Sequence, residues 1–187
     1  TTSRPKGVVI THANQVAQVQ SLVLAWAWSS SDRIPLFLPL HHIHGLVNVL
    51  ACALWSGARV EMLGEFDAAH VLERVGSNAF TMFMAVPTIY VKLVAKFDAA
   101  APEEATHWAE AFRALRLMVS GSAALPASLH QRWEQLTGQC LLERYGMTEI
   151  GMALSNPLHG ERRPGAVGLP LPGVEVRLVD EDGRVLS

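Results

Sequence analysis

The chain has 187 residues, of which 50% are hydrophobic and 17% are charged, and its formal net charge is −2. A chain of this length can bury a sizeable core, and its charge gives no basic surface for nucleic acid or an anionic membrane. The longest apolar run, at 45–55, is interrupted by Asn48 and is too short to cross a bilayer.

The first half alternates helical and strand patterns, as in an α/β domain. It predicts strands at 8–10, 59–63 and 80–86, and helices at 13–26, 41–55 and 87–97. Thr11 or Asn14 lies near the start of the first helix, and Pro87 opens the third in the position that proline prefers. The stretch 97–108 is rich in alanine and acid and predicts a surface connection.

The second half predicts a strand at 115–119, a small-residue turn at 120–124 and a helix beginning at Pro126 that ends at Gly138. A further strand at 140–143 precedes a loop at 144–149. Both loops leave the carboxyl ends of strands, where ligands bind in open α/β sheets.

After Gly168 the pattern changes to a turn at 169–173, an alternating strand at 174–179 and a hairpin signal at 180–183. We therefore predict an α/β fold of layered mixed sheets with packed helices over residues 1–165. Residues 166–187 would begin a small β subdomain.

Two segments carry chemistry. The sequence Tyr145-Gly146-Met147-Thr148-Glu149 places an aromatic ring, a glycine, a hydroxyl and a carboxylate in one short stretch. Residues 1–7, TTSRPKG, offer hydroxyls, a lysine and a glycine that can wrap phosphate oxygens, although they are not a Walker A motif.

Four motifs, in this order and spacing, resemble the adenylate-forming superfamily of acyl-CoA synthetases, luciferases and adenylation domains: TTSRPKG at 1–7, LPLHHIHG at 38–45, SGSAAL at 120–125 and ERYGMTE at 143–149. The resemblance continues through PGAVGLPLPG at 164–173. The segments LLERYGMTEIGMAL at 141–154 and MAVPTIY at 84–90 are most similar to the malonyl-CoA synthetases, including the mitochondrial acyl-CoA synthetase family member of that activity. Ser3 stands where the family's phosphate loop usually has glycine.

The resemblance implies nucleotide contacts from Thr1, Thr2, Lys6, Gly121, Ser122, Ala123, Tyr145, Gly146 and Thr148. Thr148 would hydrogen-bond the α-phosphate, and Tyr145 would face the adenine. Glu149, an oxygen ligand suited to Mg²⁺, would bind the metal and share the catalytic role with Thr148. The alternatives are a core tyrosine for Tyr145, an acid at a helix N-terminus for Glu149 and a plain turn for Gly121, Ser122 and Ala123.

His41, His42 and His44 match the gate of the family's acyl pocket, as does Met147 after the tyrosine. His41 and His44, at i and i+3, also suggest a metal cage, but no carboxylate or cysteine accompanies them with ligand spacing. Histidines hydrogen-bonded to backbone on a helix face are the third interpretation.

Arg144 indicates the substrate. A guanidinium facing an acyl pocket would be desolvated and unpaired beside a fatty chain, whereas the second carboxylate of a dicarboxylic acid can take it as a bidentate pair. The alternative is a salt bridge with Glu143, Glu149 or another acid.

The resemblance implies an ATP-dependent acid–thiol ligase that uses Mg²⁺, converts malonate or methylmalonate to an acyl-adenylate and transfers the acyl group to CoA. The alternatives are a synthetase for another short or medium-chain acid, or a non-catalytic nucleotide-binding fragment. We expect a piece of an N-terminal domain, inactive alone, because the family's ribose-binding Asp and catalytic Lys would follow Ser187. Cys52 and Cys140, which lack C-x-x-C spacing, predict a reducing compartment. We expect the cytoplasm, with the mitochondrial matrix as the alternative.

Overall fold

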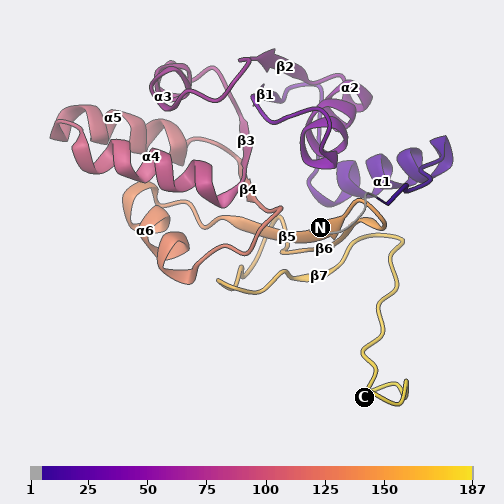
Figure 1. The fold of residues 1–187 in the computed structure, drawn as a ribbon. Helices are drawn as coiled ribbons and strands as arrows, with labels where there is room; N and C mark the ends of the chain where they lie inside the picture. The colour runs from indigo at the N-terminus through magenta and orange to yellow at the C-terminus, as the bar shows by residue number, and fades with distance from the viewer. Residues whose placement is uncertain (1–5, 187) are drawn as a thin grey trace.

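The computed structural model describes residues 6–186, so the predictions for Thr1, Thr2 and Ser3 lie outside the described residues. Helices and strands alternate through the body of the molecule (Figure 1). In chain order, the elements are α1 His12–Ala25, β1 Arg33–Leu36, the π-helix η1 His44–Ala51, α2 Cys52–Ser56, β2 Arg59–Met62, α3 Ala68–Gly76, β3 Met82–Ala85, α4 Pro87–Ala99, α5 Pro102–Arg113, β4 Leu117–Ser120, α6 Ala127–Thr137, β5 Leu142–Met147, β6 Gly151–Ser155 and β7 Leu169–Pro170.

The strands form two sheets. β1 and β2 make a parallel pair, and the second sheet has the order β3-β4-β5-β6-β7. Within it β3, β4 and β5 are parallel, whereas β6 and β7 are antiparallel to their neighbours. Helices α4, α5 and α6 lie on one side of this sheet and α1 with η1 on the other (Figure 1). The predicted α/β class with layered mixed sheets is confirmed.

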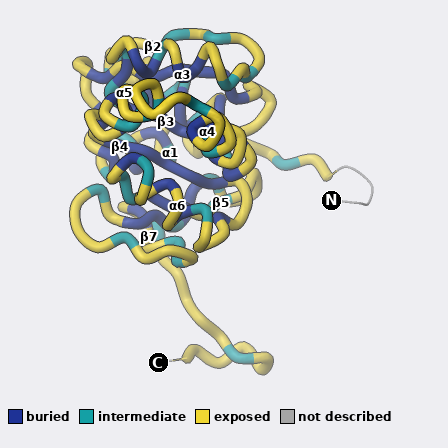
Figure 2. The backbone as a smooth tube through the Cα atoms, turned by 90° about the vertical axis from the view of Figure 1, so that its left-hand side faces the viewer, coloured by how far each residue is buried: buried dark blue, intermediate teal, exposed yellow. Residues whose placement is uncertain are grey.

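The core lies around β3 and β4, which are buried along their whole length, as expected for parallel strands covered on both faces. Five aromatic rings pack beside them with centroids 4.9 to 6.2 Å apart: Phe83, Tyr90, Phe97, Phe112 and Trp133. The Tyr90 hydroxyl donates to the Val119 carbonyl at 2.9 Å. Figure 2 shows the buried segments inside the body and the exposed ones covering it. This packing fixes the ends of the strands that lead to the site.

Local signals set the helix ends. Thr11 Oγ1 accepts from the Asn14 N–H at 3.1 Å and Asn14 Oδ1 accepts from the Thr11 N–H at 2.9 Å, a reciprocal cap that starts α1. Pro87 begins α4, and Gly138, at φ 73°, ends α6. These starts and stops were predicted and are confirmed. No helix within residues 6–186 has the length and apolar character needed to span a membrane.

Two expected elements in the first half are wrong. Residues 8–10 pair with no strand in the described part of the chain, and Val9 is 89% exposed. The supposed surface connection at 97–108 contains the end of α4 and the first part of α5, which Pro102 opens with Glu103 and Glu104 in its first turn. Acids at a helix N-terminus favour the helix dipole, so the composition that suggested a connection is the composition of a helix start.

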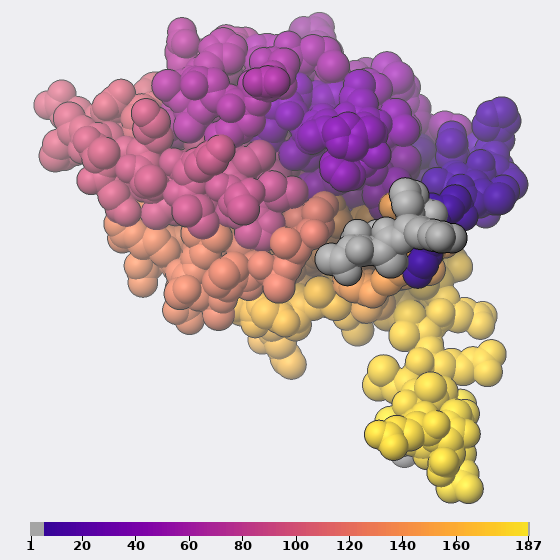
Figure 3. Space-filling model, viewed as in Figure 1, coloured from indigo at the N-terminus to yellow at the C-terminus, as the bar shows by residue number. Residues whose placement is uncertain are grey.

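Two expectations in the second half also differ from the structure. Residues 144–147 extend strand β5, and the turn between β5 and β6 is confined to 148–150. Residues 174–178 form no strand; beyond them, one antiparallel bridge joins Val179 to Val185 around the predicted hairpin turn. This C-terminal segment projects from the body (Figures 1 and 3). The division at residue 165 stays a prediction.

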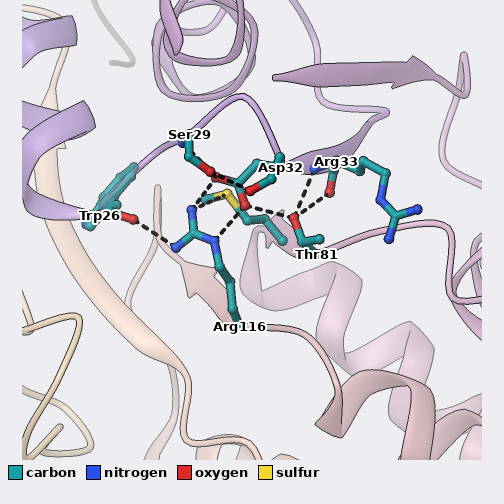
Figure 4. A network of polar contacts seen from close by, with 8 residues as sticks. Trp26, Ser29, Asp32, Arg33, Thr81 and Arg116 are labelled. Atoms are coloured by element: carbon teal, nitrogen blue, oxygen red, sulfur yellow. Dashed lines mark hydrogen bonds and ion pairs between the residues drawn. The ribbon is translucent and has the colours of Figure 1, made fainter. Parts of the chain in front are cut away.

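An ion pair between the buried Asp32 and the exposed Arg116 ties the loop after α1 to the start of β4 (Figure 4). Arg116 donates to both carboxylate oxygens of Asp32 at 2.6 Å and to the Trp26 carbonyl at 3.0 Å. Thr81 Oγ1 and the Ser29 N–H also donate to Asp32, at 2.9 and 2.8 Å. Burial alone raises the pKa of Asp32, but these donors outweigh it, so the pKa lies below its ordinary value.

Candidate functional site

The candidate site lies where β4 and β5 end beside η1. β4 and β5 are parallel neighbours, so their carboxyl ends meet at one edge of the sheet. The turn after β4 carries Gly121 and Ser122, and Arg144 is the third residue of β5. The first buried residue of η1, His44, faces this turn.

Arg144 is a buried cation without an acid partner. It is 4% exposed, and its Nη2 donates to Ser122 Oγ at 3.2 Å. Among residues 6–186 its Nε–H has no hydrogen-bond partner, and no ion pair forms with Glu143 or Glu149, so the salt-bridge interpretation is wrong. Burial lowers the pKa of Arg144 to about 10, which leaves the group charged at neutral pH.

Gly121 provides the space for this arginine. A Cβ at Gly121 would lie 2.5 Å from Cζ and Nε of Arg144. The guanidinium therefore packs directly on the backbone of the turn. A side chain at residue 121 would displace it.

Ser122 joins Arg144 to His44 from a strained conformation. Its φ is 70°, in the left-handed region that costs roughly 1 kcal/mol or more for a residue with a Cβ. Its Oγ accepts from Arg144 and lies 3.2 Å from His44 Nδ1. Strain of this kind concentrates at functional sites. The plain-turn alternative accounts for the backbone angle but not for the contacts of Ser122 Oγ with Arg144 and His44.

His44 is the second buried polar side chain here. It is 3% exposed, and burial, then Arg144 and His42, hold its pKa well below the ordinary value, so the ring is neutral. Its Nε2 has no hydrogen-bond partner in the described part of the chain. In the tautomer in which the Ser122 hydroxyl donates to Nδ1, the ring proton lies on Nε2, and Arg144 Nε–H and His44 Nε2–H are then two buried donors without acceptors.

The other two histidines have different surroundings. His41 and His42 are exposed in the turn before η1, with ring centroids 4.3 Å apart. The helix predicted at 41–55 begins only at His44, so the i, i+3 geometry of the metal-cage interpretation does not form. Residues 6–186 hold no group of three or more His, Cys, Asp or Glu placed to bind a metal ion.

The π-helix η1 was not predicted. A Cβ on Gly45 would lie 2.7 Å from the Pro39 carbonyl oxygen and 2.8 Å from that of Leu38, so the helix start packs tightly on backbone. Asn48 lies four residues after His44, just under one π-helical turn. Asn48 is 1% exposed, and both its amide atoms lack partners within residues 6–186. Single-turn π-bulges are frequent at functional sites.

A cavity of about 660 Å³ opens beside η1. Its walls are α1, η1, the turn at 148–150 with the start of β6, and residues 172–174. Asn48 and Gln18 line it, and Thr148 and Glu149 stand on its rim, both exposed. Two predicted catalytic residues thus share one opening.

Gln18 links α1 to β6 at this wall of the cavity, and it was not predicted from the sequence. It accepts from the Met152 N–H and donates to the Met152 carbonyl at 3.4 Å, so α1 pairs with the outer backbone of β6. A glutamine on an amphipathic helix is typical of a solvated face, so the sequence carried no signal for this contact.

Strand β5 separates its side chains between two faces. Arg144 points inward, whereas Tyr145 and Met147 are each 42% exposed on the other side. The core-tyrosine interpretation is therefore wrong, and the ring is accessible. Gly146 lies where the register with β6 shifts, and a Cβ there would clash with the Gly151 carbonyl and Met152. Gly146 is thus required by the close approach of two strands.

Glu143, also missed, anchors the base of β5. Its Oε1 accepts from the Gly165 N–H at 2.8 Å and lies 3.3 Å from His130 Nδ1. Its backbone carbonyl accepts from Asn156 Nδ2 at 3.0 Å. These contacts hold β5 from the face opposite Arg144.

Three predicted contacts with the nucleotide or metal are accessible. Lys6, Ala123 and Glu149 are exposed. The Glu149 carboxylate has no ion pair or hydrogen bond with any described residue, so both oxygens remain available. One carboxylate completed by substrate phosphates and water is a donor set that Mg²⁺ uses, and the residues present fit this ion.

Comparison with known proteins gives one consistent result. The model of the family described as AMP-binding enzyme matches residues 1–187. The mitochondrial malonate–CoA ligase ACSF3 of Mus musculus is 54% identical over 190 residues, covering 97% of this chain and 32% of that protein. The malonate–CoA ligase of Arabidopsis thaliana is 44% identical, covering 97% of this chain and 32% of that protein.

Solved structures agree. A malonyl-CoA ligase ternary product complex with methylmalonyl-CoA and AMP bound is 41% identical, with a TM-score of 0.87 over 96% of this chain and 38% of that one. ATP-bound MatB from Rhodopseudomonas palustris is 37% identical, with a TM-score of 0.86 over 100% of this chain and 35% of that one. The chain spans about a third of the length of the curated relatives it matches.

Proposed function

Because this chain belongs to the AMP-binding enzyme family, we propose that it forms part of an ATP-dependent acid–thiol ligase that activates malonate or methylmalonate. The acid attacks the α-phosphate of ATP to give an acyl-adenylate and pyrophosphate. The thiol of CoA then displaces AMP to give the acyl-CoA.

One observation supports the choice of acid: Arg144 is a buried cation with an unpartnered Nε–H, and His44, in the tautomer with its proton on Nε2, adds a second buried donor. A carboxylate only accepts hydrogen bonds, so it satisfies both donors and neutralises the guanidinium. The carboxylate that is not adenylated fills this role. A fatty chain would leave the charge unpaired, which disfavours the alternative of a fatty-acyl synthetase.

The nucleotide side would use the residues on the opposite face of β5 and on the cavity rim. Tyr145 offers its exposed ring to the adenine, and Thr148 a hydroxyl to the α-phosphate. Glu149 would hold Mg²⁺, which neutralises phosphate charge when bound. Gly121 and Ala123 let backbone approach the ligand, and Lys6 supplies a cation for the phosphates. The nucleotide contacts of Thr1 and Thr2 stay predictions.

We also propose that the protein acts in mitochondria, the alternative of the two compartments predicted above. The support is the mitochondrial designation of relatives at 52–54% identity. The exposed His41 and His42 would form the entrance for the acid, whereas Met147 lies on the face of β5 that carries Tyr145, so its predicted contact with the acid stays a prediction. Immunolocalisation of the full-length protein tests the compartment, and a cytoplasmic signal would contradict it.

Arg144→Met in the full-length protein tests the choice of acid. It removes the charge and keeps an apolar body, so kcat/KM for malonate should fall at least about 100-fold, the loss expected for a buried charged hydrogen bond. Activity with acetate and butyrate should be spared. Equal loss with all three acids would show that Arg144 is structural and would overturn the proposal.

A further inference from the structure

Gln18 completes the part of strand β6 that leads out of the turn at 148–150. The pairing of β6 with β7 lies at 154–155, the far end of the strand, and does not reach Met152. At Met152 the Gln18 amide takes the place of a partner strand, because its Oε1 accepts from the backbone N–H and its Nε2 donates to the carbonyl at 3.4 Å. A side-chain amide carries the same donor and acceptor as a peptide group, so it can pair with backbone in this way.

Gly151 allows this close approach between α1 and β6. Its φ is 67°, and a Cβ at this position would overlap the Gln18 amide. Any other residue would therefore strain the backbone and displace the glutamine side chain. The backbone that follows the turn is thus shaped to receive Gln18.

The turn itself has few contacts of its own. The Ile150 N–H donates to the Met147 carbonyl at 3.2 Å, and within residues 6–186 the side chains of Thr148 and Glu149 form no hydrogen bond or ion pair. Both side chains are exposed on the rim of the 660 Å³ cavity, which Gln18 also lines. Exposed segments with few contacts open locally at little cost, so the position of this turn depends on the backbone beside it.

Two further hydrogen bonds join α1 to the residues around β6. Ser21 Oγ donates to the Pro172 carbonyl at 2.8 Å, and Trp26 Nε1 donates to Ser155 Oγ at 3.0 Å. Both partners lie farther along the chain from the turn than Met152 does. Among these contacts of α1, the one made by Gln18 is therefore the one that bears most directly on the turn.

We propose, on the basis of the proposed function, that Gln18 is a positioning residue for the adenylation step. It holds the turn against α1 in the place where Glu149 binds Mg²⁺ and Thr148 reaches the α-phosphate. It acts through the backbone of Met152 and not by contact with the metal or the acid. Small displacements of catalytic groups are costly in rate, so loss of this contact slows adenylation and leaves the choice of acid unchanged.

The test compares full-length wild type with Gln18→Met and Gln18→Ala. Methionine has a similar length, favours a helix and lacks both polar atoms, and alanine also removes the amide if the methionine variant folds poorly. In both variants pyrophosphate exchange with malonate should slow about tenfold, and the Mg²⁺ concentration for half-maximal rate should rise. The malonate-to-acetate ratio of kcat/KM should stay that of wild type, because Arg144 and His44 are unchanged.

Hydrogen exchange gives a second readout that needs neither metal nor turnover. The backbone amides of 148–152 should exchange faster in Gln18→Met than in wild type, because the turn opens more often. A double-mutant cycle shows whether Gln18 acts through the metal-binding residue. In a Glu149→Gln background, Gln18→Met should slow pyrophosphate exchange by much less than tenfold.

Ser21→Ala is the matched control. It removes another hydrogen bond made by α1, so it should lower the melting temperature and leave both the Mg²⁺ requirement and the hydrogen exchange of 148–152 unchanged. An unchanged Mg²⁺ requirement in both Gln18 variants, an equal rise in Ser21→Ala, or a fall in the malonate-to-acetate ratio overturns the inference. Wild type without malonate-dependent pyrophosphate exchange would instead overturn the proposed function, and the hydrogen exchange of 148–152 would still decide the role of Gln18.

Discussion

At the scale of single residues, the candidate site contains three energetically unfavourable features, which a bound anion would partly offset. Arg144 is desolvated without an acid, Ser122 holds a left-handed backbone, and His44 Nε2 has no hydrogen-bond partner within residues 6–186. Each is unfavourable in the free protein. A carboxylate bound between Arg144 and His44, as proposed above, would remove two of these costs at once, so binding energy and charge selectivity would come from the same atoms.

A pair of variants at Ser122 separates the effect of backbone strain from the effect of hydrogen bonding. Ser122→Gly and Ser122→Ala both remove Oγ, so both should weaken malonate binding, measured as KM. Glycine accepts φ 70° and alanine does not, so the glycine variant should be more stable by about 1 kcal/mol in denaturant unfolding. Equal stability of the two variants would show that the backbone at residue 122 is unstrained.

Glu149→Gln tests the metal role. The change keeps shape and removes charge, so adenylation should slow about 100-fold and the Mg²⁺ concentration for half-maximal rate should rise. Pyrophosphate exchange over a magnesium titration measures both. Exposed Glu161, which pairs with Arg163, supplies the control Glu161→Gln, which should match wild type. An unchanged magnesium dependence in Glu149→Gln would remove the residue from the metal site.

At the scale of elements, short contacts between backbones place the functional side chains. Gly45 lets η1 start against the carbonyls of the preceding loop, and Gly146 lets β6 approach β5. The Asp32–Arg116 pair links the loop after α1 to β4, the strand that leads into the turn of Ser122. The position of the site therefore depends on contacts between elements distant in sequence.

Gly45→Ala should displace the start of η1. The added Cβ meets two carbonyl oxygens that cannot rotate away, so we expect a loss of about 1–3 kcal/mol in unfolding free energy. His44 should move with the helix and lower kcat/KM for malonate more than for acetate. A variant with the melting temperature of wild type would contradict the tight packing seen here.

Asp32→Asn should destabilise the fold in a pH-dependent way. The pKa of Asp32 in the folded state lies below its unfolded value, so its stabilisation is present above the unfolded pKa and is lost as pH falls through the folded pKa. We expect the variant to lose about 2 kcal/mol at pH 7 and the difference from wild type to shrink toward pH 3. Chemical denaturation at several pH values measures it, and a pH-independent difference would refute the ionic contribution.

Most sequence signals that act within one turn predicted the structure, with the acidic start of α5 as the exception, and signals that depend on distant segments did not. The cap of Thr11 and Asn14, the start at Pro87 and the stop at Gly138 are local and were found. The contact between Ser122 and His44 joins residues 78 positions apart, and η1 becomes a π-helix beside carbonyls that no periodicity reveals. Arg144 was identified by its chemistry, but its place on a strand came from pairing with β6.

At the scale of the whole molecule, apolar side chains collect outside the core on one side. Val16, Leu46, Leu54 and Trp55 are exposed on α1, η1 and α2, beside a second hollow of about 420 Å³. A patch of this kind marks an interaction surface or promotes aggregation. We therefore expect this patch to affect how residues 1–187 behave in solution when they are expressed alone.

Residues 1–187 expressed alone should self-associate, and Leu54→Gln with Trp55→Gln should reduce this without lowering the melting temperature. Both side chains are more than half exposed, so their replacement removes apolar surface and little packing. Light scattering over a concentration series measures the association. A monodisperse monomer for the unchanged chain would contradict the prediction.

The two-sided division of β5 has a consequence for how this scaffold can diversify. Because successive residues face opposite ways, inserting or deleting one residue in β5 would exchange the acid-facing and nucleotide-facing chemistry at every position beyond it. Substitution at residue 144, if Arg144 binds the acid as proposed, should change the acid and leave Tyr145 in place. New substrate ranges are therefore reached by exchanging side chains at fixed length, and a library that varies the length of this strand should yield inactive proteins.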